Sequence, residues 1–251
     1  MSEFEGHDNL EIVSKSNNFN KWMYEEIFPG LKGDILEVGS GQGLFSKWII
    51  RDFPKSKITL SEISPSYLKK LKSEFDLNNV SICKLDLNKK KDFEEIGYEK
   101  FDSIFALNVL EHIENDEFAF KQLFKMLKPN GNLIILVPCH KFLYNVIDKS
   151  IGHWRRYTKN ELKVKLDNAS FKTEKIFGFN ALGIIGWYLN GNIGKNPNLN
   201  PKATKLFDVN FGNKENDAIN RVLKSKFWAS GSGVGNVAKF ELEFKKFVNS
   251  R

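Results

Sequence analysis

The stretch that decides the fold is DILEVGSGQGLFSKWII, residues 34–50. Its first part, DILEVGS, is an apolar run that predicts a buried strand, and LFSKWIIRDF after the glycines has helical spacing. Gly39, Gly41 and Gly43 lie between the two. Glycine allows a tight turn and close approach of a ligand to the backbone, whose amides can bind an electron-rich ligand atom. Because such turns also occur without a ligand, the loop alone identifies none.

Strands and helices alternate from this loop to about residue 140. Four further strands are predicted at 57–63, 80–87, 101–109 and 132–138, and helices at 64–75, with Ser64 as N-cap and Pro65 at the first position, and at 117–128, ending at the turn PNG (129–131). Alternation of this kind requires parallel strands joined by right-handed crossovers. The fold class is therefore α/β, a doubly wound Rossmann-like sheet.

The remainder of the chain completes the predicted sheet. Thr158 and Glu161 form a capping box that opens a helix to about Asn168. FKTEKIFGF (171–179) predicts a sixth strand, and NVAKFELEFKKF (236–247) a last strand, antiparallel to its neighbour. The expectation is a seven-stranded, mostly parallel sheet with an antiparallel last strand, plus a small C-terminal helical insertion.

Composition excludes several classes of protein. The 251 residues carry a net charge of +7, and only five of the 38 basic residues are arginine, so lysine covers a solvated surface. Two cysteines exclude a disulfide scaffold and fit a reducing compartment. The N-terminus lacks the layout of a signal peptide, and no apolar run reaches about 18 residues. We expect a cytoplasmic protein without a transmembrane segment.

Acidic residues at two successive strand ends indicate the ligand. Glu62 ends the second strand, where a carboxylate can accept hydrogen bonds from both ribose hydroxyls. Asp86 ends the third, where it can accept from an adenine amino group. With the glycine loop they predict an adenosine site. The spacing GSGQG places Leu44 where the dinucleotide fingerprint has its third glycine, which disfavours NAD.

Several motifs together resemble the class I S-adenosylmethionine-dependent methyltransferases. The motifs are LEVGSGQG, the acid Glu62, LDL with Asp86, NVLEHI (108–113) and LKPNGNLIILVP. They look most like the small-molecule, type 11/23-like branch whose fourth-strand motif is LEH, over residues 30–140. GHWRRYT (152–158) is similar to a bacterial subgroup with the motif GHxRRYT, whose members often accompany glycan or surface-polysaccharide genes.

The resemblance implies S-adenosylmethionine as cofactor and S-adenosylhomocysteine as product. It divides the chain into an N-terminal helical cap (1–30), with a helix at 22–28 over the cofactor, a cofactor-binding core (31–140) and a substrate-side region that completes the sheet (141–251). Asn108 would face the sulfonium end and departs from many relatives. The implied cofactor contacts are Glu37, Gly39, Ser40, Gly41, Glu62, Ile63, Asp86, Leu87 and Asn108.

Candidate catalytic residues are His112 in LEHI and His153 in GHWRRY, because histidine is a suitable general base at neutral pH. A structural hydrogen-bonding role remains open for both. Arg155, Arg156 and Tyr157 are predicted to bind substrate, since arginine is scarce here and pairs with carboxylates and phosphates. The alternative is an internal salt bridge, for example to Asp148 or Glu161. No cluster has metal-ligand spacing, so we expect no metal.

The predicted function is methyl transfer from S-adenosylmethionine to a small-molecule or glycan-like acceptor, anionic and methylated at oxygen. An RNA methyltransferase and a non-catalytic cofactor-binding protein are the alternatives, although NVLEH stands where enzymes that methylate nucleic-acid amines often have D/N-P-P-Y/F. Residues 180–194 fit a lid, an interface, core, or a peripheral membrane contact. Monomer and homodimer both remain open.

Overall fold

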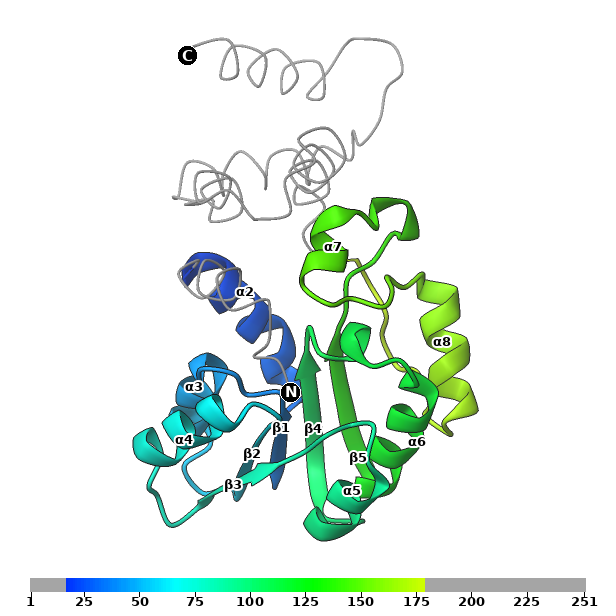
Figure 1. Ribbon diagram of the computed structural model, residues 1–251. Coiled ribbons are helices and arrows are strands. Elements are labelled where there is room, and N and C mark those ends of the chain that lie inside the picture. Colours follow the sequence, from blue (N-terminus) through cyan, green and yellow to red (C-terminus); the bar gives the residue numbers. More distant parts are fainter. Residues whose placement is uncertain (1–16, 179–251) are drawn as a thin grey trace, which may run out of the picture. The chain divides into compact units, whose positions relative to one another are not determined.

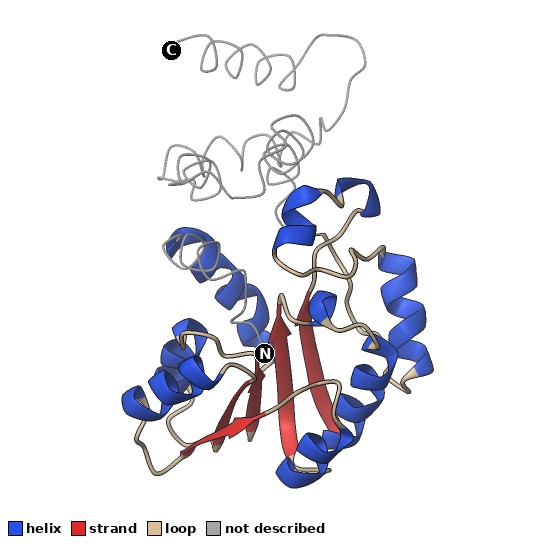
Figure 2. Cartoon of the chain, in the orientation of Figure 1, coloured by secondary structure: helices blue, strands red, loops and turns tan. Residues whose placement is uncertain are grey.

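The computed structural model describes residues 17–178, and their centre is a five-stranded parallel sheet (Figures 1 and 2). The strands are β1 (Ile35–Val38), β2 (Ile58–Glu62), β3 (Val80–Lys84), β4 (Phe101–Leu107) and β5 (Leu127–Leu136). Their order is β3-β2-β1-β4-β5, and every pairing is parallel. The order reverses between β1 and β4, where ligands of doubly wound sheets bind.

Helices cover both faces of the sheet. They are α2 (Asn17–Ile27), α3 (Leu44–Asp52), α4 (Pro65–Glu74), α5 (Lys90–Ile96), α6 (Asp116–Met126), α7 (Val146–Ser150) and α8 (Lys159–Asn168), with 3-10 turns η1 (Phe28–Gly30), η2 (Leu110–His112) and η3 (Lys141–Leu143). Figure 1 shows α3 and α4 on one side of the sheet, with α5, α6 and α8 on the other. The fold is thus a three-layer α/β/α arrangement.

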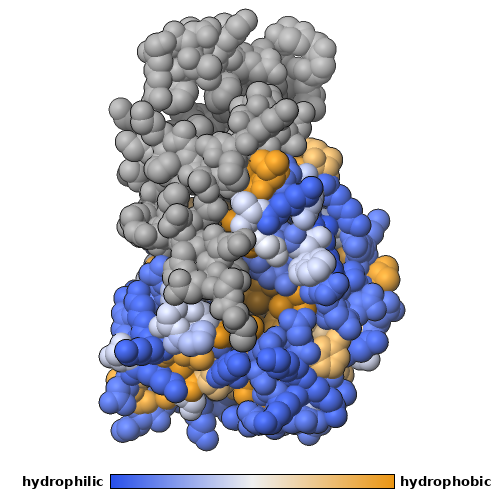
Figure 3. All heavy atoms as spheres, in the orientation of Figure 1, coloured by the Kyte–Doolittle hydropathy of each residue, from blue (hydrophilic) through white to orange (hydrophobic). Residues whose placement is uncertain are grey.

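Two hydrophobic clusters hold these layers together. Successive residues of a strand point to opposite faces of the sheet. Ile35 packs with α2, α3 and α4, whereas Leu36 packs with α5, α6 and α8. Phe105 and Ile104 of β4 divide in the same way. Continuous apolar runs such as ILEV therefore reflect burial of both faces of a parallel sheet. Hydrophilic side chains cover most of the described surface visible in Figure 3, with hydrophobic ones in patches between them.

Most of the elements predicted from sequence are confirmed. All five strands of the first half are present, and Ser64 and Pro65 begin α4. Thr158 accepts a hydrogen bond from the Glu161 amide at the start of α8, which is one half of the predicted capping box, whereas the Glu161 carboxylate pairs with Lys141. The predicted helix at 22–28 is the C-terminal part of α2, apart from Phe28. Placement of that helix over the cofactor, and the three-part domain division, stay predictions.

The turn PNG does not separate helix from strand. Helix α6 ends at Met126, and β5 already pairs at Leu127 with Phe101, whereas the next pair is Asn132 with Ser103. Three extra residues of β5 are accommodated between these pairs, and Asn130 has a positive φ of 63°. The turn signal therefore marks an irregularity within β5.

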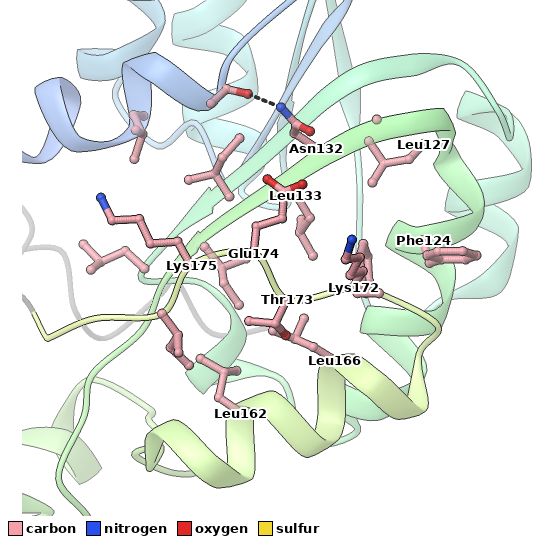
Figure 4. Close-up of a pocket in the computed structure, with 18 of the residues that line it drawn as sticks. Phe124, Leu127, Asn132, Leu133, Leu162, Leu166, Lys172, Thr173, Glu174 and Lys175 are labelled. Carbon is pink, nitrogen blue, oxygen red and sulfur yellow. Dashed lines mark hydrogen bonds between the residues drawn. The ribbon is translucent and has the colours of Figure 1, made fainter.

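The predicted sixth strand is wrong for the residues that the structure describes. Residues 171–178 have no regular secondary structure. Their alternating pattern is strand-like, but a strand needs a hydrogen-bonded neighbour, and no described strand pairs with them. They lie beside α8 and β5 and line a hollow of about 1640 Å³ with Leu133 and Leu166 (Figure 4). The last strand (236–247) and residues 180–194 lie outside the described range, so the seven-stranded sheet stays a prediction.

Candidate functional site

The glycine loop after β1 contacts the residues that follow β4. Gly39 has a φ of 72°, and a Cβ at this position would be 2.6 Å from Cγ2 of Val109. Gly41 also has a positive φ, 54°, but nothing lies within 4 Å of where its Cβ would be. The loop therefore needs glycine for close packing at Gly39 and leaves open space at Gly41, at the point where strand order reverses.

The Glu62 carboxylate connects the end of β2 to this loop. One oxygen accepts a hydrogen bond of 2.8 Å from the Gly41 amide, and the other accepts from the amides of Ile63 and Ser64. A carboxylate has about four acceptor positions, so it can accept a further donor such as a ribose hydroxyl. Ile63 beside it is 47% exposed, whereas Ser40 in the loop is buried.

Asp86 lies two residues beyond β3 and is held as an anion. Its Oδ1 accepts hydrogen bonds from the amide and side chain of Asn88, and Lys89 pairs with Oδ2 at 3.2 Å. Burial acts to raise the pKa of Asp86, but these partners outweigh burial and hold the pKa below its usual value. The carboxylate can therefore accept from an amino group. Leu87, next to it, is buried in the hydrophobic core.

Glu37 and Asn108 flank the loop from β1 and β4. Glu37 is 3% exposed and accepts a hydrogen bond from the Ser46 hydroxyl. Burial raises the pKa of Glu37 from 4.5 to about 8. Asn108, directly after β4, is exposed, has a φ of 54° and donates its amide to the carbonyl of Leu136.

These residues fit an adenosine-containing cofactor. Open space at Gly41, a carboxylate at the end of β2 and a second one after β3 provide room and acceptors along one edge of the sheet. The large hollow along β5 is a different feature, because none of these residues lines it. Binding of a cofactor at the edge formed by the ends of β1, β2 and β3 stays a prediction.

Two distant segments join at the carboxyl end of β4. The amide of Trp154 donates to the carbonyl of Glu111 at 2.8 Å, and the Tyr157 hydroxyl oxygen lies 3.2 Å from the carbonyl oxygen of Leu110. The rings of His112 and His153 meet edge to face, with centroids 4.6 Å apart. The structure therefore brings both predicted catalytic histidines together.

Each histidine is oriented by an oxygen. Nδ1 of His153 lies 2.8 Å from Oδ1 of Asp148, and Nδ1 of His112 lies 3.3 Å from the carbonyl of Gly152. Burial and the neighbouring His153 lower the pKa of His112 to about 4. His112 is therefore neutral at physiological pH, and both histidines contact the segment 148–157.

The RRY residues make internal contacts. Arg156 donates to both oxygens of Asp148 at 2.9 and 3.0 Å, which confirms the alternative of an internal salt bridge. Arg155 pairs with Asp116 at 2.8 Å, and the Tyr157 hydroxyl donates to the same carboxylate at 2.8 Å. Substrate binding by Arg155, Arg156 and Tyr157 stays a prediction.

Asp116 was missed because its position in the first turn of a helix is also that of an ordinary capping acid. Its 2% exposed side chain binds three partners, the third being Lys165 at 2.8 Å. Glu111 lies within LEHI, and no sequence signal shows that its side chain is completely buried.

Comparison with known proteins agrees with this geometry. A family model described as "Methyltransferase domain" matches residues 36–133, which include β1 to β4 and the strand-end acids. Over residues 36–133 the chain therefore matches an S-adenosylmethionine-dependent methyltransferase domain. Its cofactor is S-adenosylmethionine, and S-adenosylhomocysteine is the product. The type 11/23-like branch and the GHxRRYT subgroup stay predictions.

The individual relatives have low sequence identity to this chain. The methyltransferase domain is similar to "Malonyl-[acyl-carrier protein] O-methyltransferase 1" of Ilyobacter polytropus, 25% identical over 207 residues, covering 77% of this chain and 73% of the relative. A second such enzyme of that organism is 32% identical over 153 residues, covering 57% and 55%. The chain spans only 5% of the length of "Probable polyketide synthase 29" of Dictyostelium discoideum, at 26% identity over 160 residues and 56% of this chain.

A solved structure supports the fold. The S-adenosylmethionine-dependent methyltransferase of Mesorhizobium loti superposes with a TM-score of 0.52 at 16% identity, covering 64% of this chain and 84% of that one. Between residues 17 and 178, no helix combines the length and apolar character needed to cross a bilayer.

Proposed function

We propose that the protein transfers the methyl group of S-adenosylmethionine to an oxygen of a small-molecule or acyl acceptor. The observation that carries the proposal is the convergence of Gly41, Glu62 and Asp86 at one sheet edge within a methyltransferase domain. Transfer to oxygen is supported by the names of two relatives, both O-methyltransferases acting on a malonyl-carrier protein.

The cofactor would lie across the carboxyl ends of β1, β2 and β3. Glu62 would accept the ribose hydroxyls, Asp86 the adenine amino group, and Asn108 would face the sulfonium end. Methyl transfer is an in-line displacement, so the main task of the protein is to hold acceptor and methyl group in line. The remaining predicted contacts, Glu37, Gly39, Ser40, Gly41, Ile63 and Leu87, would shape and flank this space.

The acceptor would approach from the side of His112 and His153. A general base needs a ring nitrogen with a lone pair, and in a neutral ring whose Nδ1 faces an acceptor oxygen that nitrogen is Nε2. Asp148 would orient His153 in the way that a carboxylate orients a catalytic histidine.

The structure gives no support to the negative charge that the sequence suggested for the acceptor. Arg155 and Arg156 are engaged within the protein, so they lend no support to an anionic acceptor. The glycan-like acceptor and a role in polysaccharide synthesis stay predictions from resemblance, without support from the relatives named above. RNA methylation has no further support either, since positive charge alone attracts nucleic acid non-specifically.

The test is a product assay for S-adenosylhomocysteine with a panel of acceptors. The panel contains malonyl-acyl carrier protein, anionic sugars, nucleotide sugars and RNA. We expect turnover with an acyl or small-molecule acceptor, its loss in Glu62→Ala, and unchanged turnover in Glu94→Ala, which removes an exposed acid of α5. Turnover with RNA alone, or cofactor binding without turnover, would overturn the proposal in favour of the corresponding alternative.

A further inference from the structure

Three side chains with metal-ligand chemistry converge beside the carboxyl end of β4. Glu111 and His112 belong to η2, and His153 follows α7. One ligand atom from each lies within 4.8 Å of the other two, and Nε2 of His153 is 3.7 Å from Oε1 of Glu111. Ligands about 2.0–2.1 Å from a tetrahedral zinc ion are roughly 3.3 Å apart. The Glu111–His153 distance exceeds this value by about 0.4 Å, and no separation within the cluster exceeds it by more than about 1.5 Å.

The Glu111 carboxylate lacks a partner of the usual kind. Its side chain is completely buried, and within the described part of the chain no other residue donates a hydrogen bond to either oxygen. Burial raises the pKa of Glu111 to about 8. Buried polar groups are nearly always paired, and an unpaired one in a native structure calls for an explanation such as an ion. A cation would supply the missing partner.

Each of the two histidines has an oxygen acceptor at Nδ1. A carboxylate and a carbonyl only accept, so His153 donates Nδ1–H to Asp148 and His112 donates Nδ1–H to Gly152. In the neutral form of each ring, the lone pair is then at Nε2. Metal-bound histidines almost always donate their other ring nitrogen to a carboxylate or carbonyl in this way. Arg156 and the Asn145 amide in turn fix Asp148.

We propose that Glu111 and the Nε2 atoms of His112 and His153 bind one divalent transition-metal ion, of which zinc is the representative. Two imidazoles and one carboxylate suit zinc or iron(II), whereas Mg²⁺ and Ca²⁺ prefer oxygen ligands only. Three protein ligands leave a coordination position open. The sequence predicted no metal because His153 lies some 40 positions after Glu111 and His112, and a separation of this size is not a recognisable metal-ligand motif.

Metal binding does not require the cofactor, since the site uses none of the predicted cofactor contacts. If an ion is bound, it occupies the lone pairs of both histidines. They then act as ligands and not as general bases for the acceptor. The chemical consequence is that a metal-free protein and a metal-loaded protein differ in which group handles the acceptor's proton.

The test uses the full chain after treatment with a chelator, without S-adenosylmethionine. Calorimetric titration with Zn²⁺ is expected to show one site, and titration with Mg²⁺ none. Glu111→Gln, which keeps the shape of the side chain, should weaken Zn²⁺ binding at least tenfold. His140→Ala removes an exposed histidine outside the cluster and should bind as the wild type does.

A spectroscopic measurement on the wild type keeps the proposal testable if the variant does not fold. X-ray absorption of the protein loaded with Zn²⁺ should show two imidazole nitrogens among the ligands. Absence of a single zinc site in the wild type, a ligand set without imidazole, or equal binding by a folded Glu111→Gln would overturn the proposal. S-adenosylhomocysteine binding by the same preparation reports separately on the cofactor site, so failure of one leaves the other intact.

Discussion

Substitution of Glu37 by glutamine should change how stability depends on pH. Burial in β1 raises the pKa of Glu37 from 4.5 to about 8, whereas the unfolded chain has the ordinary value. The folded protein therefore keeps a proton that the unfolded chain releases. Its contribution is fully present below about pH 4.5 and is lost as pH rises to about 8. At about 1.4 kcal/mol per pH unit, the loss is roughly 5 kcal/mol.

The free energy of unfolding of wild type and Glu37→Gln would be measured in urea at several pH values between about 5 and 9, without cofactor. Glutamine keeps an acceptor for Ser46 and carries no charge, so the variant lacks this loss. The variant should gain on the wild type by up to roughly 5 kcal/mol as pH rises.

Matched controls isolate the effect. Glu111, whose pKa burial also raises to about 8, titrates in both proteins and cancels from their difference. Glu94→Gln, at an exposed position, should differ from wild type by the same amount at every pH. A constant difference between wild type and Glu37→Gln across the range would refute the reasoning.

Three further substitutions test the site and its support. Gly41→Ala should cost about 1–2 kcal/mol of stability, since φ is 54°, and weaken S-adenosylhomocysteine binding at least tenfold by filling open space, as measured by calorimetry. Unchanged affinity would contradict this. Arg156→Met should lower the free energy of unfolding by about 3–5 kcal/mol, because Asp148 would stay buried without its cation. A loss under about 1 kcal/mol would argue against that role. Tyr157→Phe should cost about 1–3 kcal/mol in the same urea assay, since Asp116 loses a buried donor, and no loss would contradict the observed bond.

The sequence predicted which residues follow β1, β2 and β3, whereas their contacts with a cofactor stay predictions. Runs such as DILEV and KITLSEI are local signals, and in a parallel sheet residues that follow strands meet at one edge whatever the details of packing. Gly41 and Glu62, 21 residues apart, are accordingly joined by a hydrogen bond. Even so, burial of Glu37 and its raised pKa depend on packing that no local pattern shows.

The acceptor half could not be predicted in the same way. The motifs LEHI and GHWRRY contact each other although their residues are about 40 positions apart. The chain between them contains a turn and the short helix α7, whose sequences have no clear periodicity. Arg155 and Arg156 stand out in a chain that contains few arginines, but this scarcity gives no information about which residues they contact. Whether Arg156 faces a ligand or Asp148 is decided by tertiary packing, as is the meeting of Glu111 with two histidines.

The most direct test of the account is calorimetric titration with S-adenosylhomocysteine of the wild type, Glu62→Ala and the control Glu94→Ala. We predict saturable binding at one site in the wild type and the control, and loss of binding in Glu62→Ala. Absence of binding by the wild type, or equal binding by a folded Glu62→Ala, would contradict the placement of the cofactor at the ends of β1, β2 and β3.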